Sequence, residues 1–527
     1  MLRIDPQDKE ILVDPLFKMG RGFYLIVGVL GAIVAWGVFT YARQIIFGLG
    51  VTGMQRPAYW GAYMVNFVFF IGISHAGTLI SAILRVTQAE WRRPITRIAE
   101  AITVFALVVG TLQIFFDLGR PERMLYLFIY GRPQSPLLWD AMSVTAYFLG
   151  SVSYLFMPLI PDLAIVRDNM PATAPRWRKI FYNVLSLGWR GNRTQWVRLE
   201  KAIAVMAILI IPIAVSVHTI ISWILATTVQ PGWHSTIFGP YFVVGAIFSG
   251  IGALFVAMAI ARKLLKLEAY ITEKQFTFLS YLQIAMTAIW FYFTFAEHLT
   301  LAAGQQGDEF PILLDKLFGE YAGGFWLMVV CMIIAFWILL MPRLAPAALT
   351  RVPIMRARYA IASVFIGFVL SGVTIQQPEQ ITAAIPLFSS RLLGFAIAAV
   401  FFVLAGISAL PWLKRNIVGS TVLAALPVLL GMWLERWNIV VPTLTHPRLI
   451  PYSFYIPSET EISLTIASFA LFALMFVLFF KLFPPISIWE VAEGRVIDQA
   501  KAEVHLPLPE VSAVRRLRRF GLPEAEA

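Results

Sequence analysis

Long apolar segments recur along the whole chain, and short polar connections separate them. A helix needs about 20 apolar residues to cross the hydrocarbon core of a bilayer. An open sheet would leave backbone groups unpaired in lipid, so the pattern predicts an all-α polytopic membrane bundle of about 10–12 transmembrane helices. Segments of sufficient length lie near residues 23–42, 60–84, 98–116, 137–160, 201–226, 240–261, 276–298, 324–341, 359–376, 390–412, 417–437 and 462–483.

Lysine and arginine residues are concentrated in alternate connections between these segments. Cytoplasmic connections of membrane proteins carry an excess of Lys and Arg. If the N-terminus lies inside, the basic connection 161–200 is cytoplasmic, and the connection 227–239, which has no lysine or arginine, is on the outer side. The pattern therefore predicts a multi-pass protein with both ends of the chain in the cytoplasm.

Composition excludes a soluble globular protein, because 59% of the residues are hydrophobic and only 14% are charged. The net charge of +12 comes mainly from the predicted cytoplasmic connections and tail, so we expect it to reflect membrane topology and not nucleic-acid binding. Cys331 is the only cysteine, which excludes an intrachain disulfide and a cysteine-ligated zinc site or iron–sulfur cluster built by this chain alone. Residues 1–22 lack a signal-peptide core, so no cleavage is expected there.

The order of the spans divides the chain into five predicted regions. Residues 1–22 form a cytoplasmic lead-in, 23–341 a membrane core, 342–416 an inserted helix pair, 417–483 two further core helices and 484–527 a cytoplasmic tail. The segment PAYWGAYMVNFVFFIGISHAG of the second span resembles GPYFVVGAIFSGIG of the sixth, since both have proline and aromatics followed by small residues that allow close helix packing. Two four-helix bundles would explain this repeat, and chance similarity is the alternative.

Ionisable side chains are rare in the predicted spans, and their cost in lipid makes each one a candidate functional residue. His75 is expected near the middle of the second span and His218 in the outer half of the fifth, so the two should lie at different depths and should not ligate a haem together. The other candidates are expected near the outer face: Asp117, Arg120, Asp140, Glu297, His298, Glu435 and Arg436. Structural alternatives are a helix-end salt bridge between Asp117 and Arg120 and, for Glu435 with Arg436, an interfacial pair or a staple within the bundle.

Aromatic residues make up 14% of the chain, and several are expected near the outer interface, including Tyr59, Trp60, Tyr63 and Trp139. Such residues commonly form the aromatic belt of a membrane protein. The other interpretation is the mouth of a pocket for an amphipathic ring such as a quinone.

Several motifs resemble the NrfD/PsrC family of integral membrane subunits. They are HAGTLISAILR, LGRPER, SPLLWD, VSVHTIISW, PGWHSTIFGPYF, GMWLERWNIVVPTL and LFPPISIWEV, and together they cover nearly the whole chain except 342–416 and the tail. Within the family, the sequences of these motifs are most similar to those of the quinol-oxidising membrane subunit of bacterial alternative complex III. Two positions depart from the family pattern: Trp223 is not followed by an acidic residue, and Asp117 stands where the family often has histidine.

The resemblance implies a subunit of the bacterial cytoplasmic membrane that binds menaquinol or another quinone near the periplasmic face and holds no haem or iron–sulfur cluster of its own. The implied partners are a periplasmic iron–sulfur subunit, multihaem cytochrome c subunits, a second NrfD-like membrane subunit and lipids. On this interpretation His75, Asp117, Asp140 and Arg120 bind quinol or transfer its protons. His218, Glu297, His298, Glu435 and Arg436 would belong to a proton path or to the second bundle.

Two other functions remain open from the sequence. An NrfD-type anchor of a polysulfide or other molybdenum-dependent reductase would have a similar sequence. A secondary transporter with about twelve helices belongs to another class, but the spans lack a clear pair of Gly/Pro-broken helices at corresponding midplane positions.

Overall fold

The computed structural model describes residues 4–344, 361, 363–365, 367, 398–406 and 412–503. Within these ranges the secondary structure is helical apart from turns, loops and one isolated bridge between Gln55 and Ala58, which confirms the all-α prediction. Ten described helices are long and apolar enough to cross a membrane, and they coincide with ten predicted spans. The other two predicted spans, 359–376 and 390–412, lie mostly outside the described residues.

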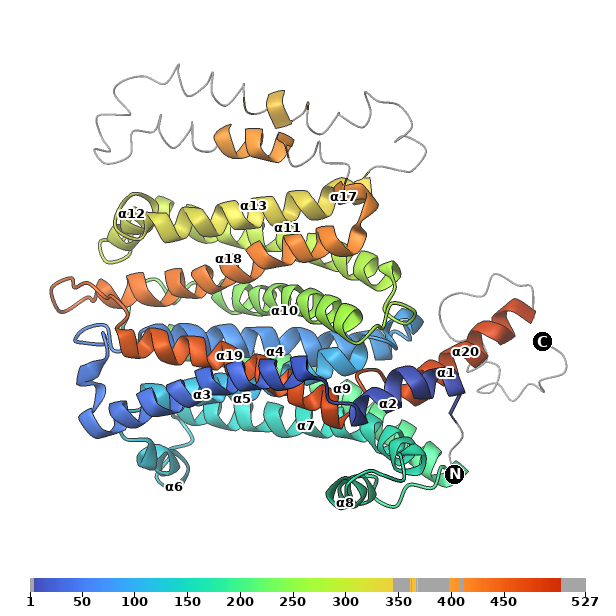
Figure 1. Ribbon diagram of the computed structural model, residues 1–527. Helices are drawn as coiled ribbons and strands as arrows, with labels where there is room; N and C mark the ends of the chain where they lie inside the picture. Colours follow the sequence, from blue (N-terminus) through green and yellow to red (C-terminus); the bar gives the residue numbers. More distant parts are fainter. Residues whose placement is uncertain are drawn as a thin grey trace.

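The long helices lie side by side with similar axes (Figure 1). They are α3 (Arg21–Phe47), α4 (Ala62–Val86), α5 (Thr96–Asp117), α7 (Pro136–Asn169), α9 (Arg193–Ala226), α10 (Phe238–Leu264), α11 (Glu273–Gly304), α13 (Ala322–Leu344), α18 (Ile417–Thr445) and α19 (Glu459–Leu482). The short helices are α1 (Pro6–Asp8), α2 (Asp14–Phe17), α6 (Tyr126–Ile129), α8 (Arg176–Leu185), α12 (Phe310–Phe318), α17 (Trp412–Arg415) and α20 (Ile488–Glu503). A wider, π-helical turn occupies Lys9–Val13, and tight 3-10 turns occupy Leu49–Val51, Glu90–Arg92 and Pro121–Leu125.

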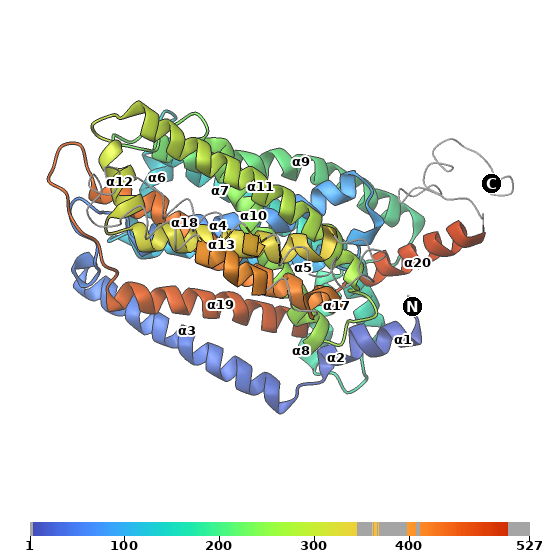
Figure 2. The ribbon, with the colours of Figure 1, turned by 90° about the horizontal axis from the view of Figure 1, so that it is seen from above.

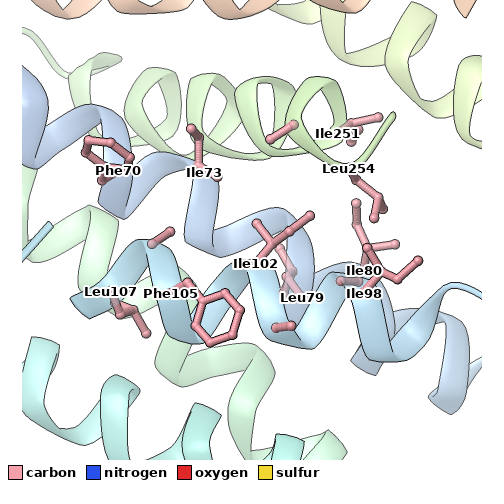
Figure 3. Packing of buried hydrophobic residues seen from close by; sticks show 14 of the residues in the cluster. Phe70, Ile73, Leu79, Ile80, Ile98, Ile102, Phe105, Leu107, Ile251 and Leu254 are labelled. Carbon is pink, nitrogen blue, oxygen red and sulfur yellow. The ribbon is translucent and has the colours of Figure 1, made fainter. Parts of the chain in front are cut away.

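The first bundle consists of α4, α5, α7 and α9. α4 and α5 approach closely at Gly77, where a Cβ atom would lie 1.9 Å from the carbonyl oxygen of Ala99. The Thr103 hydroxyl of α5 accepts from the backbone N–H of Thr78 and donates to the carbonyl of Ser74, both at 2.7 Å. Apolar side chains of α4, α5 and α10 fill the layer around this contact (Figure 3): Phe70, Ile73, Leu79, Ile80, Ile98, Ile102, Phe105, Leu107, Ile251 and Leu254.

The second bundle consists of α10, α11, α13 and α18. The helices that carry the internal repeat, α4 and α10, are each the first helix of their bundle in chain order, and they pack against each other. The prediction of two four-helix bundles is thus confirmed for the described residues. α19 packs against the first bundle, and α3 packs on the far side of α19 (Figure 2).

The connections gather at two ends of the bundle. α6 and α12 lie at one end, which we call the outer end after the predicted topology (Figure 1). α1, α2, α8 and α20 lie at the opposite, inner end. The helical segments nearest the two termini, α1 and α20, therefore lie on the same side of the protein.

The predicted tail begins as a helix docked on the first bundle. The Glu490 carboxylate of α20 pairs with Arg85 and, at 3.0 Å, with Arg92, and its backbone carbonyl accepts from Arg93 at 2.6 Å. Burial alone would raise the pKa of Glu490, but the arginine charges around it hold this pKa down at about 2. Residues 504–527 lie outside the described ranges, so the predicted properties of the tail end stay a prediction.

Candidate functional site

An apolar groove of about 290 Å³ runs between α5 and α7 in the first bundle. Val108, Thr111 and Leu112 of α5 line it together with Val144, Thr145 and Phe148 of α7. Thr145 is exposed although it lies well within a membrane-spanning helix. The groove is therefore accessible from the lipid-facing surface of the bundle.

Two carboxylates lie outward of this groove, one on each of its helices, and neither lines it. Asp117 is the last residue of α5, five residues beyond Leu112, and Asp140 lies on the first turns of α7, four residues before Val144. At 1.5 Å per residue, each lies roughly 6–8 Å outward from the groove along its helix. Each carboxylate has one buried oxygen without a hydrogen-bond partner. An acceptor without a donor is costly to bury, so both oxygens are available to a hydroxyl donor.

Asp117 adjoins a hydrogen-bonded polar cluster. The Gln44 side-chain amide donates to the carbonyl of Phe116 at 2.6 Å, and the Tyr63 hydroxyl donates to Gln44 at 2.7 Å. Arg120 is exposed, and among the described residues no ion pair joins it to Asp117. The alternative of a helix-end salt bridge between these two residues is therefore wrong.

His75 and His218 meet inside the first bundle. Both are fully buried, and their ring centroids lie 3.9 Å apart. The expectation that they lie at different depths is wrong, because α4 and α9 differ in length and their outer ends are not level. The two nitrogens of His75 approach the backbone carbonyls of Ile71 and Ala214, whereas neither nitrogen of His218 has a hydrogen-bond partner.

His75 and Asp117 are well separated. The ring of Phe116, next to Asp117, lies 5.9 Å from the ring of Tyr63, so Asp117 is level with Tyr63 on α4. Tyr63 precedes His75 by twelve residues, which corresponds to roughly 18 Å along the helix. His75 does not line the groove. Its ring centroid lies 5.1 Å from that of Tyr147 on α7. One small ring in the groove could not contact both residues.

The second bundle holds a separate cavity of about 40 Å³ near its outer end, lined by apolar residues and by several ionisable side chains. Glu297 and His298 of α11, Glu435 of α18 and Lys316 of α12 line it. Loss of hydration lowers the pKa of Lys316 to about 8, although the charge of Glu297 opposes this shift. A cavity of this size has room for a few water molecules and none for a quinone ring.

Glu435 and Arg436 lie deeper than predicted. α18 continues to Thr445, so the pair lies about ten residues from the helix end, and each side chain is only 1% exposed. Their assignment to an interfacial position at the helix end is therefore wrong. Glu435 accepts from the Trp290 indole N–H at 2.6 Å and pairs with Arg436. Glu297 and His298 are also set back from the end of their helix, since α11 runs on to Gly304.

Arg436 extends from the second bundle toward the first. Its guanidinium fits against two glycines: a Cβ atom would lie 2.8 Å from Nη2 at Gly245 of α10 and 3.7 Å from it at Gly72 of α4. Nη2 is buried without a hydrogen-bond partner. A discontinuous series of polar groups thus leads from the cavity through Glu435 and Arg436 toward the histidine pair.

Comparison with known proteins identifies the family. The family described as "Polysulphide reductase, NrfD" matches residues 50–375, well over half of the chain. The chain belongs to the NrfD family. It is accordingly a multi-pass integral membrane protein.

Curated relatives of this NrfD-family chain are membrane subunits of redox enzymes. It is 29% identical to a Halobacterium salinarum protein assigned as a membrane subunit of dimethyl sulfoxide reductase, over 49% of this chain and 55% of that protein. It is 26% identical to a selenate reductase subunit of Mesobacillus selenatarsenatis, over 42% and 53%. It is 24% identical to the Hdr-like menaquinol oxidoreductase integral membrane subunit of Archaeoglobus fulgidus, over 44% and 49%. The chain thus spans about half the length of the curated relatives it matches.

The predicted pocket aromatics of this NrfD-family protein do not gather at one place. Trp60 stacks on Trp233 with ring centroids 6.4 Å apart, and Tyr63 joins the cluster beside Asp117. Tyr59 is 61% exposed, and Trp139 is 40% exposed and donates to the carbonyl of Pro133. Tyr63 lies beside Asp117, and Trp139 directly precedes Asp140 in the sequence.

Several buried or half-buried polar residues of the NrfD-family fold were not predicted from the sequence. Lys316 and Trp290 carried no signal, because a loop lysine and a span tryptophan are common in membrane proteins. Glu461, which is fully buried, accepts from the backbone N–H of Gly53 at 2.7 Å and from the Tyr455 hydroxyl. Its place in the capping box that begins at Ser458 was the signal that could have identified it.

Proposed function

We propose that this chain is the quinone-binding membrane subunit of a multi-subunit redox complex and that it oxidises quinol at the groove between α5 and α7. The observation that carries the proposal is an apolar groove open to lipid, with a buried, unpartnered carboxylate oxygen one to two turns outward on each of its two helices. A quinol reaches its site from the bilayer and needs an apolar surface for its ring. The groove volume, about 290 Å³, is close to the lower bound of small-molecule pockets.

Quinol oxidation releases two electrons and two protons. In our proposal the free oxygen of Asp117 accepts a phenolic hydrogen bond and then the proton, and Asp140 on α7 serves as the second acceptor. Arg120 lies just beyond Asp117 and would favour the charged carboxylate. The electrons pass to a partner subunit that carries iron–sulfur clusters or haems, because a single cysteine cannot build a cysteine-ligated cluster.

The polar groups deeper in the protein are proposed to move protons. If both His75 nitrogens donate to the carbonyls they contact, the ring carries an extra proton, and His218 beside it could share that proton. Glu435, Glu297 and His298 surround a cavity large enough for water, which could carry protons between them. This route is separate from the groove and would allow proton release or translocation at the outer end.

More specifically, we propose that the complex is an alternative complex III that uses menaquinol. The similarity of the sequence motifs to that complex's membrane subunit supports this, as does the relative whose name includes menaquinol oxidoreductase. The partners would then be a periplasmic iron–sulfur subunit, multihaem cytochromes c and a second NrfD-like subunit in a bacterial cytoplasmic membrane. The second candidate is the anchor of a molybdenum-dependent reductase, which the names of the other two relatives favour. Haem staining and metal analysis of the subunits that co-purify would separate the two.

The test is Asp117→Asn in the assembled complex, with quinol-dependent electron transfer as the readout. Loss of a proton acceptor should lower the rate by about a hundredfold to ten-thousandfold. Asp308→Asn is the matched control, because Asp308 is a 56% exposed aspartate at the same end, and its rate should stay normal. An assembled Asp117→Asn complex with normal turnover would remove Asp117 from the mechanism.

A further inference from the structure

The connection between α7 and α9 carries an amphipathic helix, α8, that presents three different faces. It lies at the inner end of the bundle, between the last residue of one membrane-spanning helix, Asn169, and the first residue of the next, Arg193. Because both neighbouring helices cross the membrane, α8 lies near the level of the membrane surface.

One face of α8 is fixed to the protein. The Arg178 guanidinium donates to the carbonyl of Leu16 at 2.7 Å and to that of Lys481 at 3.4 Å, and the Tyr182 hydroxyl donates to the carbonyl of Leu482 at 3.0 Å. The last carbonyls of a helix lack partners within it. α8 thus satisfies the C-terminal end of α19.

The second face is apolar and uncovered. Trp177, Ile180 and Val184 are 53%, 56% and 61% exposed. At 100° per residue these three side chains fall within about 60° of one another on the helix. An apolar stripe of this kind beside the ends of membrane spans is typical of a helix that lies in the membrane interface.

The third face is polar and basic. Arg176, Lys179 and Asn183 are exposed and lie together on the side of the apolar stripe away from the protein. Arg190 and Arg193, also exposed, follow in the same connection, and residues 170–193 contain no acidic side chain. The uncovered part of α8 is therefore positively charged as well as apolar.

We propose that α8 lies in the membrane interface and binds the headgroups of anionic phospholipids. The apolar stripe would enter the boundary between headgroups and acyl chains, and Arg176 and Lys179 would reach the phosphates. Charge complementarity selects this occupant, because a basic amphipathic helix at a membrane surface is attracted to anionic lipid. Lipid bound here would also stabilise the C-terminal end of α19, to which α8 is hydrogen-bonded.

The position of α8 can be tested in the full chain reconstituted into vesicles. Cys331→Ser removes the only cysteine, and single cysteines at Ile180 and at Asn183 then carry a fluorescent label. Nitroxide lipids should quench the label at position 180 more strongly than the label at 183, and iodide in the water should show the reverse order. A label at 180 that iodide reaches and lipid does not would overturn the proposal. So would shielding of that label from both quenchers when the partner subunits are present, since a protein would then cover the stripe.

Headgroup preference is tested with nitroxide-labelled phosphatidylglycerol and phosphatidylcholine at equal mole fraction. We expect stronger quenching by the anionic lipid, and a loss of this preference in Arg176→Gln/Lys179→Gln. Arg43→Gln, at an exposed arginine near the outer end of α3, should keep the preference. Equal quenching by the two lipids in the unsubstituted protein would overturn the selection of anionic lipid.

Discussion

Replacing Glu435 by glutamine should destabilise the second bundle strongly, because it removes the charge that compensates Arg436. Both side chains are 1% exposed, and they pair directly. Glutamine keeps the shape of the side chain and an acceptor for the Trp290 indole N–H. The substitution therefore isolates the loss of negative charge.

The size of the effect follows from the surroundings of Arg436. Its guanidinium lies 5.2 Å from the centre of the Phe242 ring and against Gly245, and Nη2 already lacks a partner. Removing one member of a buried ion pair costs about 3–5 kcal/mol. An isolated arginine at the centre of a membrane helix costs about 2.5–3.5 kcal/mol on insertion scales. The two ranges agree on a loss of about 3 kcal/mol.

The double variant Glu435→Gln/Arg436→Met is the diagnostic comparison. It removes both charges, so it should recover much of the stability that Glu435→Gln loses. Unfolding of a chain this long need not be two-state, so the readout is the temperature at which the purified protein stops being monodisperse after heating. Glu122→Gln, at an exposed glutamate near α6, should leave this temperature unchanged.

Two results would refute this reasoning. A Glu435→Gln protein as stable as the unsubstituted one would mean that Arg436 is hydrated or neutralised by another group. A double variant less stable than the single one would mean that packing by the arginine side chain matters more than its charge.

Three further predictions concern the ends and the close contacts of the bundle. Gly77→Val should prevent α4 and α5 from approaching, since even a Cβ would lie 1.9 Å from a carbonyl oxygen, and a normal yield of folded protein would contradict this. In a Cys331→Ser background, a cysteine at Thr236 should be labelled from the periplasm and one at Asn192 from the cytoplasm; the reverse pattern would reject the predicted topology. Because the pKa of Glu490 is lowered from 4.5 to about 2, its contacts stabilise the docking of α20 above pH 4.5, and this contribution is lost as the pH falls from 4.5 to 2. Limited proteolysis of the tail against pH, with Glu490→Gln as the comparison, measures this, and an unchanged profile in the variant would exclude Glu490 as the cause.

The helices could be predicted from the sequence because length and polarity decide whether a segment can cross lipid. The contacts between helices could not. His218 lies eight residues from the outer end of α9 and His75 thirteen residues from that of α4, so counting from the helix ends places them roughly 8 Å apart in depth. Their rings nevertheless meet, because the two helix ends lie at different heights in the bundle.

In the candidate site too, single residues could be predicted from the sequence, but the contacts between helices could not. Asp117 and Asp140 were predicted as ionisable residues near helix ends, but the groove between their helices depends on which faces of α5 and α7 oppose each other. No single-helix pattern carries that information. The convergence of Glu297, His298 and Glu435 on one cavity also arises from the packing of separate helices.

The position of Glu490 has a consequence for how the chain is made. Its partner Arg92 is 398 residues earlier in the sequence, so the arginines at the α4–α5 connection emerge long before the carboxylate that pairs with them. At translation rates of about 5–20 residues per second, the delay is roughly 20–80 s. On the predicted topology, arginines that are not yet paired with Glu490 would oppose translocation of this connection and keep the α4–α5 hairpin in its orientation. After the last helix arrives, the same arginines bind Glu490 and secure the finished protein.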